Sequence, residues 1–183
     1  MLLGSTRRGR SHWWATKNEP AGGRAADERA AVAAAFRDWA DPVPALIDAT
    51  PTAAVLRNDI IDRPPDARWV GGRVVLVGDA AHPTTPNLGQ GGCLALEDAV
   101  ALARRLAGQT DPATGLAAFG AERYPRTALI NKESWQIGRV GQWEGRMACR
   151  VRDAAFGLLL PRIGLRSMQK HAAFDVGPLR GPA

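Results

Sequence analysis

The sequence predicts an α/β fold in which a small, incomplete sheet precedes a long helical C-terminal region. Residues 73–77 (RVVLV) form a nearly continuous β-branched apolar run, the pattern of a strand covered on both faces in a parallel sheet. A glycine-rich turn and a helical pattern follow directly, and the chain from Pro112 onward is helical in character. Because one parallel strand cannot form a sheet, these observations indicate part of a larger α/β unit.

The region before this strand predicts a smaller mixed unit. Its expected elements, in chain order, are a strand over 12–16, a helix from Asp27, a short helix over 45–49 and a strand over 55–61. The tryptophans and threonine of the first strand suit a pleated surface. The helix should bury Val32, Phe36 and Trp39, which recur at helical spacing. The two strands would form an edge-rich remnant of a sheet.

The region after the strand is dominated by helices. Gly92 to Ala107 predicts a helix that ends at Gly108, with one apolar stripe formed by Leu96, Val100, Ala103 and Ala107. Residues 112–152 predict long helical segments with a kink at Pro125. A last helix over 154–171 is expected to be interrupted by Pro161.

Composition narrows the function classes. The chain of 183 residues has a formal net charge of +6, carried mostly by arginines. Acids are interspersed among them, so an arginine-rich surface explains the charge better than a nucleic-acid patch, which would cluster its cations. The longest apolar run near the C-terminus, 154–160, is far shorter than a spanning helix, and the first ten residues are not expected to be a secretory signal. Two cysteines give no disulfide framework, which favours a cytoplasmic location.

The turn after the strand has the residue types of a ligand site. Asp79 follows the strand immediately, where side chains project from the carboxyl edge of an α/β sheet and can accept hydrogen bonds from hydroxyl groups. Pro83 and Pro86 stiffen the loop. Residues 89–92 then bring bare backbone amides to the positive end of a helix, and this favours an anion or an electron-rich carbonyl.

Other interpretations of single residues are more ordinary. A glycine-rich turn before a helix is common on its own. Asp79 and His82 lack a third metal ligand, and His82 is expected to be packed or bonded to the loop. Cys93 at the helix mouth has either a lowered thiol pKa or, the preferred explanation, a space-filling role. The six tryptophans are expected in the core, and no serine lies in a nucleophile motif.

Taken together, the segments GDAAHP (78–83), Pro86, GQGGC (89–93) and LEDA (96–99) resemble the second flavin-binding motif of the flavoprotein aromatic hydroxylases. These are single-component FAD-dependent monooxygenases, a family that includes salicylate and urate hydroxylases and zeaxanthin epoxidases. Two outer segments, WWATKN (13–18) and LRNDIIDRPP (56–65), look like strands of the family's substrate domain.

The resemblance implies a partial FAD-binding, Rossmann-like domain with a remnant of an antiparallel substrate-domain sheet and a helical tail. Asp79 would bond the ribityl chain of FAD, Pro86 would lie near the reactive edge of the isoalloxazine, and the amides of 89–92 would face its pyrimidine side. The expected cofactor-binding residues are Gly78, Asp79, Pro86, Gly89, Gln90, Gly91, Gly92 and Cys93. No catalytic residue and no metal ligand is assigned.

The family mechanism implies hydride transfer from NAD(P)H to FAD, oxygen addition at flavin C4a to give a hydroperoxide, and transfer of one oxygen atom to an aromatic or polyene small molecule. Relatives of the same fold act as dehydrogenases, reductases or halogenases, so these activities stay open.

The sequence departs from the family in its first part. Family members begin with a strand and a G-x-G-x-x-G turn that holds the pyrophosphate, and they carry a central Asp-Gly motif, but this sequence shows neither. It is therefore expected to match the C-terminal half, with substrate domain over 1–62, FAD domain over 63–108 and a helical region over 109–183. A separate N-terminal flavoprotein half is then an expected partner. The alternative is a non-catalytic relic or a helical interaction module that retains the motif.

Overall fold

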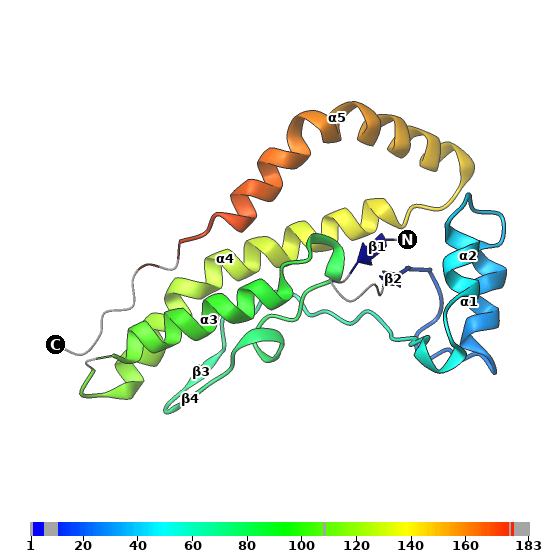
Figure 1. Ribbon diagram of the computed structural model, residues 1–183. Coiled ribbons are helices and arrows are strands. Elements are labelled where there is room, and N and C mark those ends of the chain that lie inside the picture. Colours follow the sequence, from blue (N-terminus) through cyan, green and yellow to red (C-terminus); the bar gives the residue numbers. More distant parts are fainter. Residues whose placement is uncertain (1, 6–10, 108, 176, 178–183) are drawn as a thin grey trace. The chain divides into compact units, whose positions relative to one another are not determined.

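The computed structural model describes the backbone of residues 2–5, 11–107, 109–175 and 177 (Figure 1). The chain divides into two compact units, Met1–Asp59 and Ile60–Ala183. Each unit has its own secondary structure. The three-part division expected from the sequence stays a prediction.

The first unit contains a two-stranded antiparallel sheet. Strand β1 (Leu2–Ser5) pairs with β2 (Ser11–Trp14), with Leu2 opposite Trp14. The strand expected over 12–16 is therefore confirmed within a few residues. The indole Nε1 of Trp13 donates to Thr50 Oγ1 at 2.9 Å, which ties β2 to the segment after the helices of this unit.

Helices follow where local signals predicted them. Helix α1 (Glu28–Phe36) starts at Asp27, whose carboxylate accepts the Ala30 amide and caps the first turn. Its Phe36 is buried, whereas Trp39 lies beyond the helix and is 50% exposed, in edge contact with Phe36. The remaining elements of the unit are α2 (Val43–Asp48) and the short 3-10 helix η1 (Thr52–Ala54).

The strand predicted over 55–61 is wrong. Val55 is extended, but residues 55–61 pair with no strand among the described residues, and Leu56 and Ile61 are 81% and 78% exposed. Polar contacts with an upstream loop hold the segment instead. The Arg57 carbonyl accepts from Arg24 at 2.9 Å, and the Asp59 carboxylate accepts the Gly22 amide at 2.8 Å.

The second unit opens with a short hairpin. Strands β3 (Val70–Gly71) and β4 (Val74–Val75) pair antiparallel across a turn in which Gly72 has a φ of 60°. The sequence predicted a longer strand over 73–77, buried on both faces of a parallel sheet, and this is wrong for the described residues. Val74 is 66% exposed, and the sole strand paired with it in the described part of the chain is β3.

Three helices make up most of the second unit (Figure 1): α3 (Gly91–Leu106), α4 (Pro112–Gly141) and α5 (Arg146–Ala172). Helix α4 continues through Pro125, and α5 continues through Pro161. The predicted interruption at Pro161 is therefore wrong. The chain breaks between α4 and α5 instead, where Gly145 adopts a φ of 95° that favours glycine.

Helix α3 forms as predicted, but it buries a different face. Its buried residues are Leu94, Asp98 and Ala101, while Leu96 of the predicted stripe is 72% exposed. The buried spacing is that of one helical face. The sequence did not predict this buried face of α3, because an aspartate, Asp98, lies at its centre.

The core of the second unit joins the hairpin to α3 and α4. Trp69, Ala81, Ala101 and Phe119 form the buried cluster, and the ring of Trp69 meets that of Tyr124 edge-on at 5.9 Å. The other tryptophans are not buried, so the prediction that all six lie in the core is wrong. Those at 39–50% exposure are Trp14, Trp39, Trp135 and Trp143.

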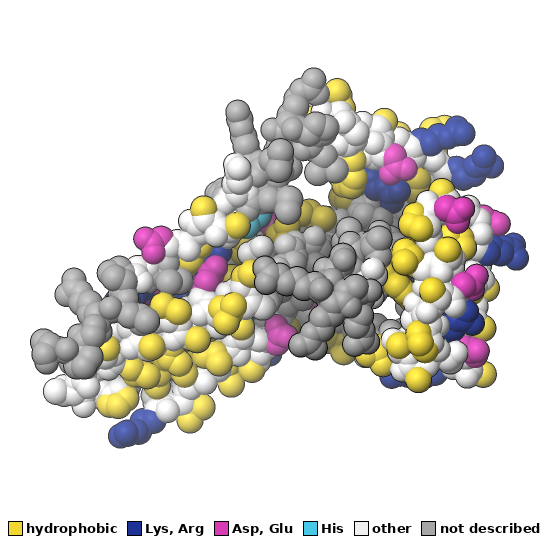
Figure 2. Space-filling model, viewed as in Figure 1, with side chains coloured by type: hydrophobic (Ala, Val, Ile, Leu, Met, Phe, Trp, Pro, Cys, Tyr) yellow, Lys and Arg dark blue, Asp and Glu magenta, His cyan; other side chains and the backbone are white. Residues whose placement is uncertain are grey.

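Apolar side chains remain at the surface of this unit. Figure 2 shows a group of them over the hairpin and α3. Exposed apolar residues of this region are Val74, Leu76, Val77 and Leu96, at 40–72%. Across the described residues, no helix combines the length and apolar character needed to cross a membrane.

Close packing of α4 on α3 makes Gly115 a test of this arrangement. A Cβ at Gly115 would lie 2.6 Å from the Arg105 carbonyl oxygen, a backbone atom that cannot rotate away. Gly115→Ala should therefore lower the free energy of unfolding by about 1–3 kcal/mol, although alanine favours helices. Urea titration followed by circular dichroism measures this.

The matched control is Gly141→Ala in the same helix, where a Cβ meets nothing within 4 Å. This variant should be at least as stable as the parent chain. Equal stability of the two variants would contradict the close packing described.

Candidate functional site

The chain leaves β4 through a turn that only glycine allows easily. Gly78 starts the 3-10 helix η2 (Gly78–Ala80) with a φ of +56°. It is buried, and a Cβ there would also lie 3.3 Å from the Ala95 side chain of α3. Both constraints favour glycine, so this position sets the direction in which the next residue leaves.

That next residue, Asp79, has an exposed carboxylate. One of its oxygens lies 3.9 Å from where a Cβ of Gly91 would stand. The acid after the strand and the first residue of α3 are thus neighbours, twelve positions apart in sequence. The structure brings together the two features that the sequence identified separately.

The N-terminus of α3 carries backbone amides without a side-chain cap. The 3-10 helix η3 (Pro86–Leu88) ends at Gly89, whose φ is +63°, and Gln90 precedes α3 without a side-chain cap. The first helical hydrogen bond runs from the Leu94 amide to the Gln90 carbonyl at 2.9 Å. Consequently the amides of residues 91–93 lack an intrahelical acceptor.

Two glycines beside these amides border open space. A Cβ at Gly89 or at Gly92 would meet nothing within 4 Å. Cys93 is exposed, so the expectation that it fills space at the helix mouth is wrong. Pro86 is exposed as well. This end of α3 can therefore donate hydrogen bonds to an acceptor that approaches from solvent.

Helix α4 fixes the loop that joins the two features. Ser134 Oγ donates to the Thr85 carbonyl at 2.6 Å, and Asn131 Nδ2 donates to the Pro83 carbonyl at 2.7 Å. Asn87 Nδ2 donates in turn to the Ser134 carbonyl at 3.0 Å. A Cβ at Gly138 would overlap the Asn87 amide, so glycine there lets the loop dock.

Beneath the loop lies a buried ionic network that the sequence did not predict. The Asp98 carboxylate accepts hydrogen bonds from the Gly78 amide at 3.0 Å, from His82 Nε2 at 2.7 Å and from Arg123 Nε at 2.7 Å. Asp98 and Arg123 are 0% exposed and His82 is 5% exposed. The expectation that His82 is packed or bonded to the loop is confirmed.

The pKa of Asp98 lies below its ordinary value. Burial by itself raises it, but the hydrogen bonds from His82, from the Gly78 amide and from Arg123 outweigh burial. The pKa of Glu97 is lowered in the same way, with burial opposed by Arg126 and Arg123. Both carboxylates therefore stay ionised near neutral pH.

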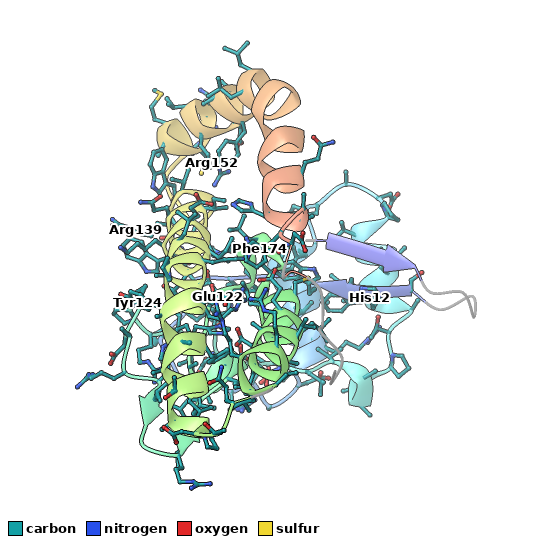
Figure 3. All side chains as sticks on the ribbon, turned by 90° about the vertical axis from the view of Figure 1, so that its left-hand side faces the viewer. His12, Glu122, Tyr124, Arg139, Arg152 and Phe174 are labelled. Carbon is teal, nitrogen blue, oxygen red and sulfur yellow. The ribbon has the colours of Figure 1, made fainter. Side chains whose placement is uncertain are left out.

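The network reaches the end of α5, where the His171 carbonyl accepts from Arg126 at 2.9 Å, and the residues just after it. Glu97 pairs with Arg123 at 2.7 Å and with Arg126 at 2.6 Å. Arg126 also lies 4.0 Å from the ring centroid of Phe174, labelled in Figure 3, a cation–π contact. Among the described residues, no three His, Cys, Asp or Glu side chains form a group that could hold a metal ion.

Comparison with known proteins identifies the family of this chain. A family model described as "FAD binding domain" matches residues 10–134. The chain belongs to this FAD binding domain family. The resemblance predicted from the loop motif is thereby confirmed, and the match takes in β2, the loop, α3 and most of α4.

This chain is similar to curated proteins named as a monooxygenase/isomerase and as an epoxidase. It is 47% identical over 146 residues to an aurachin C monooxygenase/isomerase from Stigmatella aurantiaca, covering 79% of this chain and 38% of the relative. It is 48% identical over 100 residues to a chloroplastic zeaxanthin epoxidase from Nicotiana plumbaginifolia, covering 54% and 15%. The chain thus spans well under half the length of these relatives.

A solved structure shares the fold of this family member. A variant of HpxO from Klebsiella pneumoniae, complexed with FAD, is 32% identical with a TM-score of 0.76, covering 88% of this chain and 42% of that one. A second HpxO structure contains FAD and uric acid. The fold class is therefore mixed, with helices and small antiparallel sheets. The parallel, Rossmann-like part stays a prediction.

The ionic network should make the fold sensitive to acid. Asp98 and Glu97 have folded pKa values below the ordinary 3.8 and 4.5. Their stabilisation is complete above those values and is lost as the pH falls through the lowered folded pKa values. Asp98→Asn should lower the free energy of unfolding near neutral pH by roughly 3 kcal/mol and flatten its decline in acid.

Urea titrations from neutral pH to about pH 2 measure both effects. Asp38→Asn is the control, because its carboxylate is 87% exposed, and it should keep the parent profile. An equally steep acid decline in Asp98→Asn and the parent would contradict a folded-state role for this carboxylate.

Proposed function

We propose that this chain forms the isoalloxazine and ribityl side of the FAD site of a flavoprotein monooxygenase. The observation that carries the proposal is the approach of the exposed Asp79 carboxylate to the uncapped start of α3, 3.9 Å from the Cβ position of Gly91. An acceptor for hydroxyl groups and a set of free amide donors thus lie side by side on one loop.

The residues present fit this part of the cofactor. Asp79 would accept a hydrogen bond from the ribityl chain, and the amides of residues 91–93 would donate to carbonyl oxygens of the flavin ring. The open space at Gly89 and Gly92 leaves room for a flat ring edge. The residues proposed to hold FAD are Gly78, Asp79, Pro86, Gly89, Gln90, Gly91, Gly92 and Cys93.

The protein's own part in the chemistry is positioning and electrostatics. Bound FAD supplies electron transfer between a nicotinamide and molecular oxygen, and with it the capacity for oxygen transfer. The start of α3 carries a partial positive charge, which favours negative charge on the pyrimidine side of the ring. Anchoring of the loop to α4 keeps these donors in place without reorganisation. Pro86 is proposed to lie near the reactive edge.

The relatives support a substrate class. The names aurachin C monooxygenase and zeaxanthin epoxidase, and the HpxO complex with uric acid, all concern aromatic or polyene molecules. We therefore infer hydroxylation or epoxidation of an aromatic or polyene small molecule with NAD(P)H as hydride donor. A cytoplasmic location, which two free cysteines favour, belongs to the same proposal.

The adenosine and pyrophosphate of FAD need a further binding surface. The sequence has no strand followed by a G-x-G-x-x-G turn, the usual pyrophosphate site. We propose that a flavoprotein N-terminal half provides it. The alternative, a relic or interaction module, predicts no flavin binding with or without that half.

Flavin titration separates these possibilities. The 183-residue chain should bind FAD weakly by itself, and should retain FAD when co-expressed with the N-terminal half of HpxO. Asp79→Ala should weaken binding about tenfold, since it removes one hydrogen bond to a charged group. Quenching of flavin fluorescence gives the dissociation constants.

Asp38→Ala serves as the control, because it removes an exposed carboxylate far along the chain from the loop. It should leave the affinity unchanged. Two results count against the proposal: no flavin retention in the co-expressed protein, or equal affinities for the parent and Asp79→Ala.

A further inference from the structure

We propose that Asp98 is the positioning residue of this site and sets the direction of Asp79 through Gly78 and His82. The inference rests on the proposed function, because it concerns how the flavin loop is held. Asp98 itself lies on α3, buried behind the loop, and would not contact the cofactor.

The first argument is the geometry at a single oxygen. Asp98 Oδ2 accepts both the Gly78 amide at 3.0 Å and His82 Nε2 at 2.7 Å. These donors stand at the two ends of the turn that contains Asp79. One oxygen atom therefore fixes where the turn begins and where it ends.

The second argument concerns the backbone of Gly78. Its carbonyl accepts the amides of Ala81 at 3.0 Å and His82 at 2.9 Å. Its amide has Asp98 as partner. With both polar groups bonded, the positive φ of Gly78 is held in place. Asp79 is attached directly to this residue, so its direction of departure is determined.

Asp79 has no comparable support of its own. Among the described residues, no hydrogen bond or ion pair involves its exposed carboxylate. His82 depends on Asp98 in a similar way, because its other ring nitrogen, Nδ1, is buried without a partner in the described part of the chain. Both side chains thus take their positions from the bonds at Asp98.

The third argument is the nature of the buried group. Asp98 stands between Leu94 and Ala101 on the buried face of α3, where an apolar residue would serve packing. Buried ion pairs are often replaceable by apolar side chains without loss of stability. A carboxylate that bonds both ends of the turn has a role that leucine cannot fill. Arg123, on Oδ1 at 2.7 Å, balances its charge.

A pair of flavins tests the proposal. Riboflavin carries the ribityl chain and lumiflavin does not, so their affinity ratio reports on the contacts of that chain, among them the proposed one with Asp79. The chain co-expressed with the N-terminal half of HpxO, freed of FAD, should prefer riboflavin. Asp98→Asn has a single acceptor oxygen and cannot serve all three donors, so it should lose about tenfold of this preference. Its lumiflavin affinity should stay near the parent value.

Glu97→Gln is the matched control. Glu97 is the neighbouring acid of the same ionic network, but its bonds run to Arg123 and Arg126 and not to the turn. This variant should keep the riboflavin preference. A general loosening of the fold would weaken both flavins alike, and would do so in both variants.

Circular dichroism shows whether Asp98→Asn folds. If it does not, a second variant tests the proposal. His82→Gln keeps the bond between Asp98 and Gly78 but loses the ring that closes the turn, and it should lose part of the preference. An unchanged riboflavin-to-lumiflavin ratio in the folded variants overturns the proposal.

The proposal can be separated from the proposed function. If the parent protein binds neither flavin, the flavin function is wrong, and hydrogen exchange of the Gly78 amide then decides the positioning role. Exchange of that amide should speed up about tenfold or more in Asp98→Asn and stay at the parent rate in Glu97→Gln. Equal exchange rates in the two variants would overturn it.

Discussion

The second unit depends on one buried carboxylate. Asp98 bonds the turn after β4, the histidine that closes that turn and an arginine from α4, and all of these groups are shielded from water. A buried ion is tolerated only when its hydrogen-bonding capacity is used. Since the carboxylate lies on α3 and its donors come from the turn and from α4, the ion can be satisfied only when all three segments are in place. Local geometry at the loop and packing of the helices are therefore coupled.

Helix α4 is the platform of the candidate site, although it contributes none of the residues proposed to contact a cofactor. Its Arg123, Asn131 and Ser134 each bond to α3 or to the loop, and Gly138 leaves room for Asn87. These are directional contacts, and such contacts specify one loop conformation more sharply than apolar packing does. The consequence is a loop whose free amides and carboxylate face solvent while its carbonyls are held from behind.

Sequence patterns predicted the features that depend on residues close together in the chain, such as helix starts and the family motif. Asp27 indicated the start of α1, and the glycine-rich turn indicated the start of α3 and the family. Strand pairing could not be read in this way, because 55–61 and 73–77 have strand composition but find little or no partner in the described chain. The buried face of α3 was misassigned since Asp98 reads as a surface acid. Its partner Arg123 lies 25 residues away, and nothing in the local pattern links the two.

The hairpin leaves its outer strand unprotected. Beyond its short pairing with β3, the segment from β4 to η2 carries exposed Val74, Leu76 and Val77, and such an edge can recruit any extended chain that presents free backbone groups. Unless another element covers it, self-association is the natural outcome at high concentration. We therefore expect polar substitutions at these exposed apolar positions to reduce self-association of the chain.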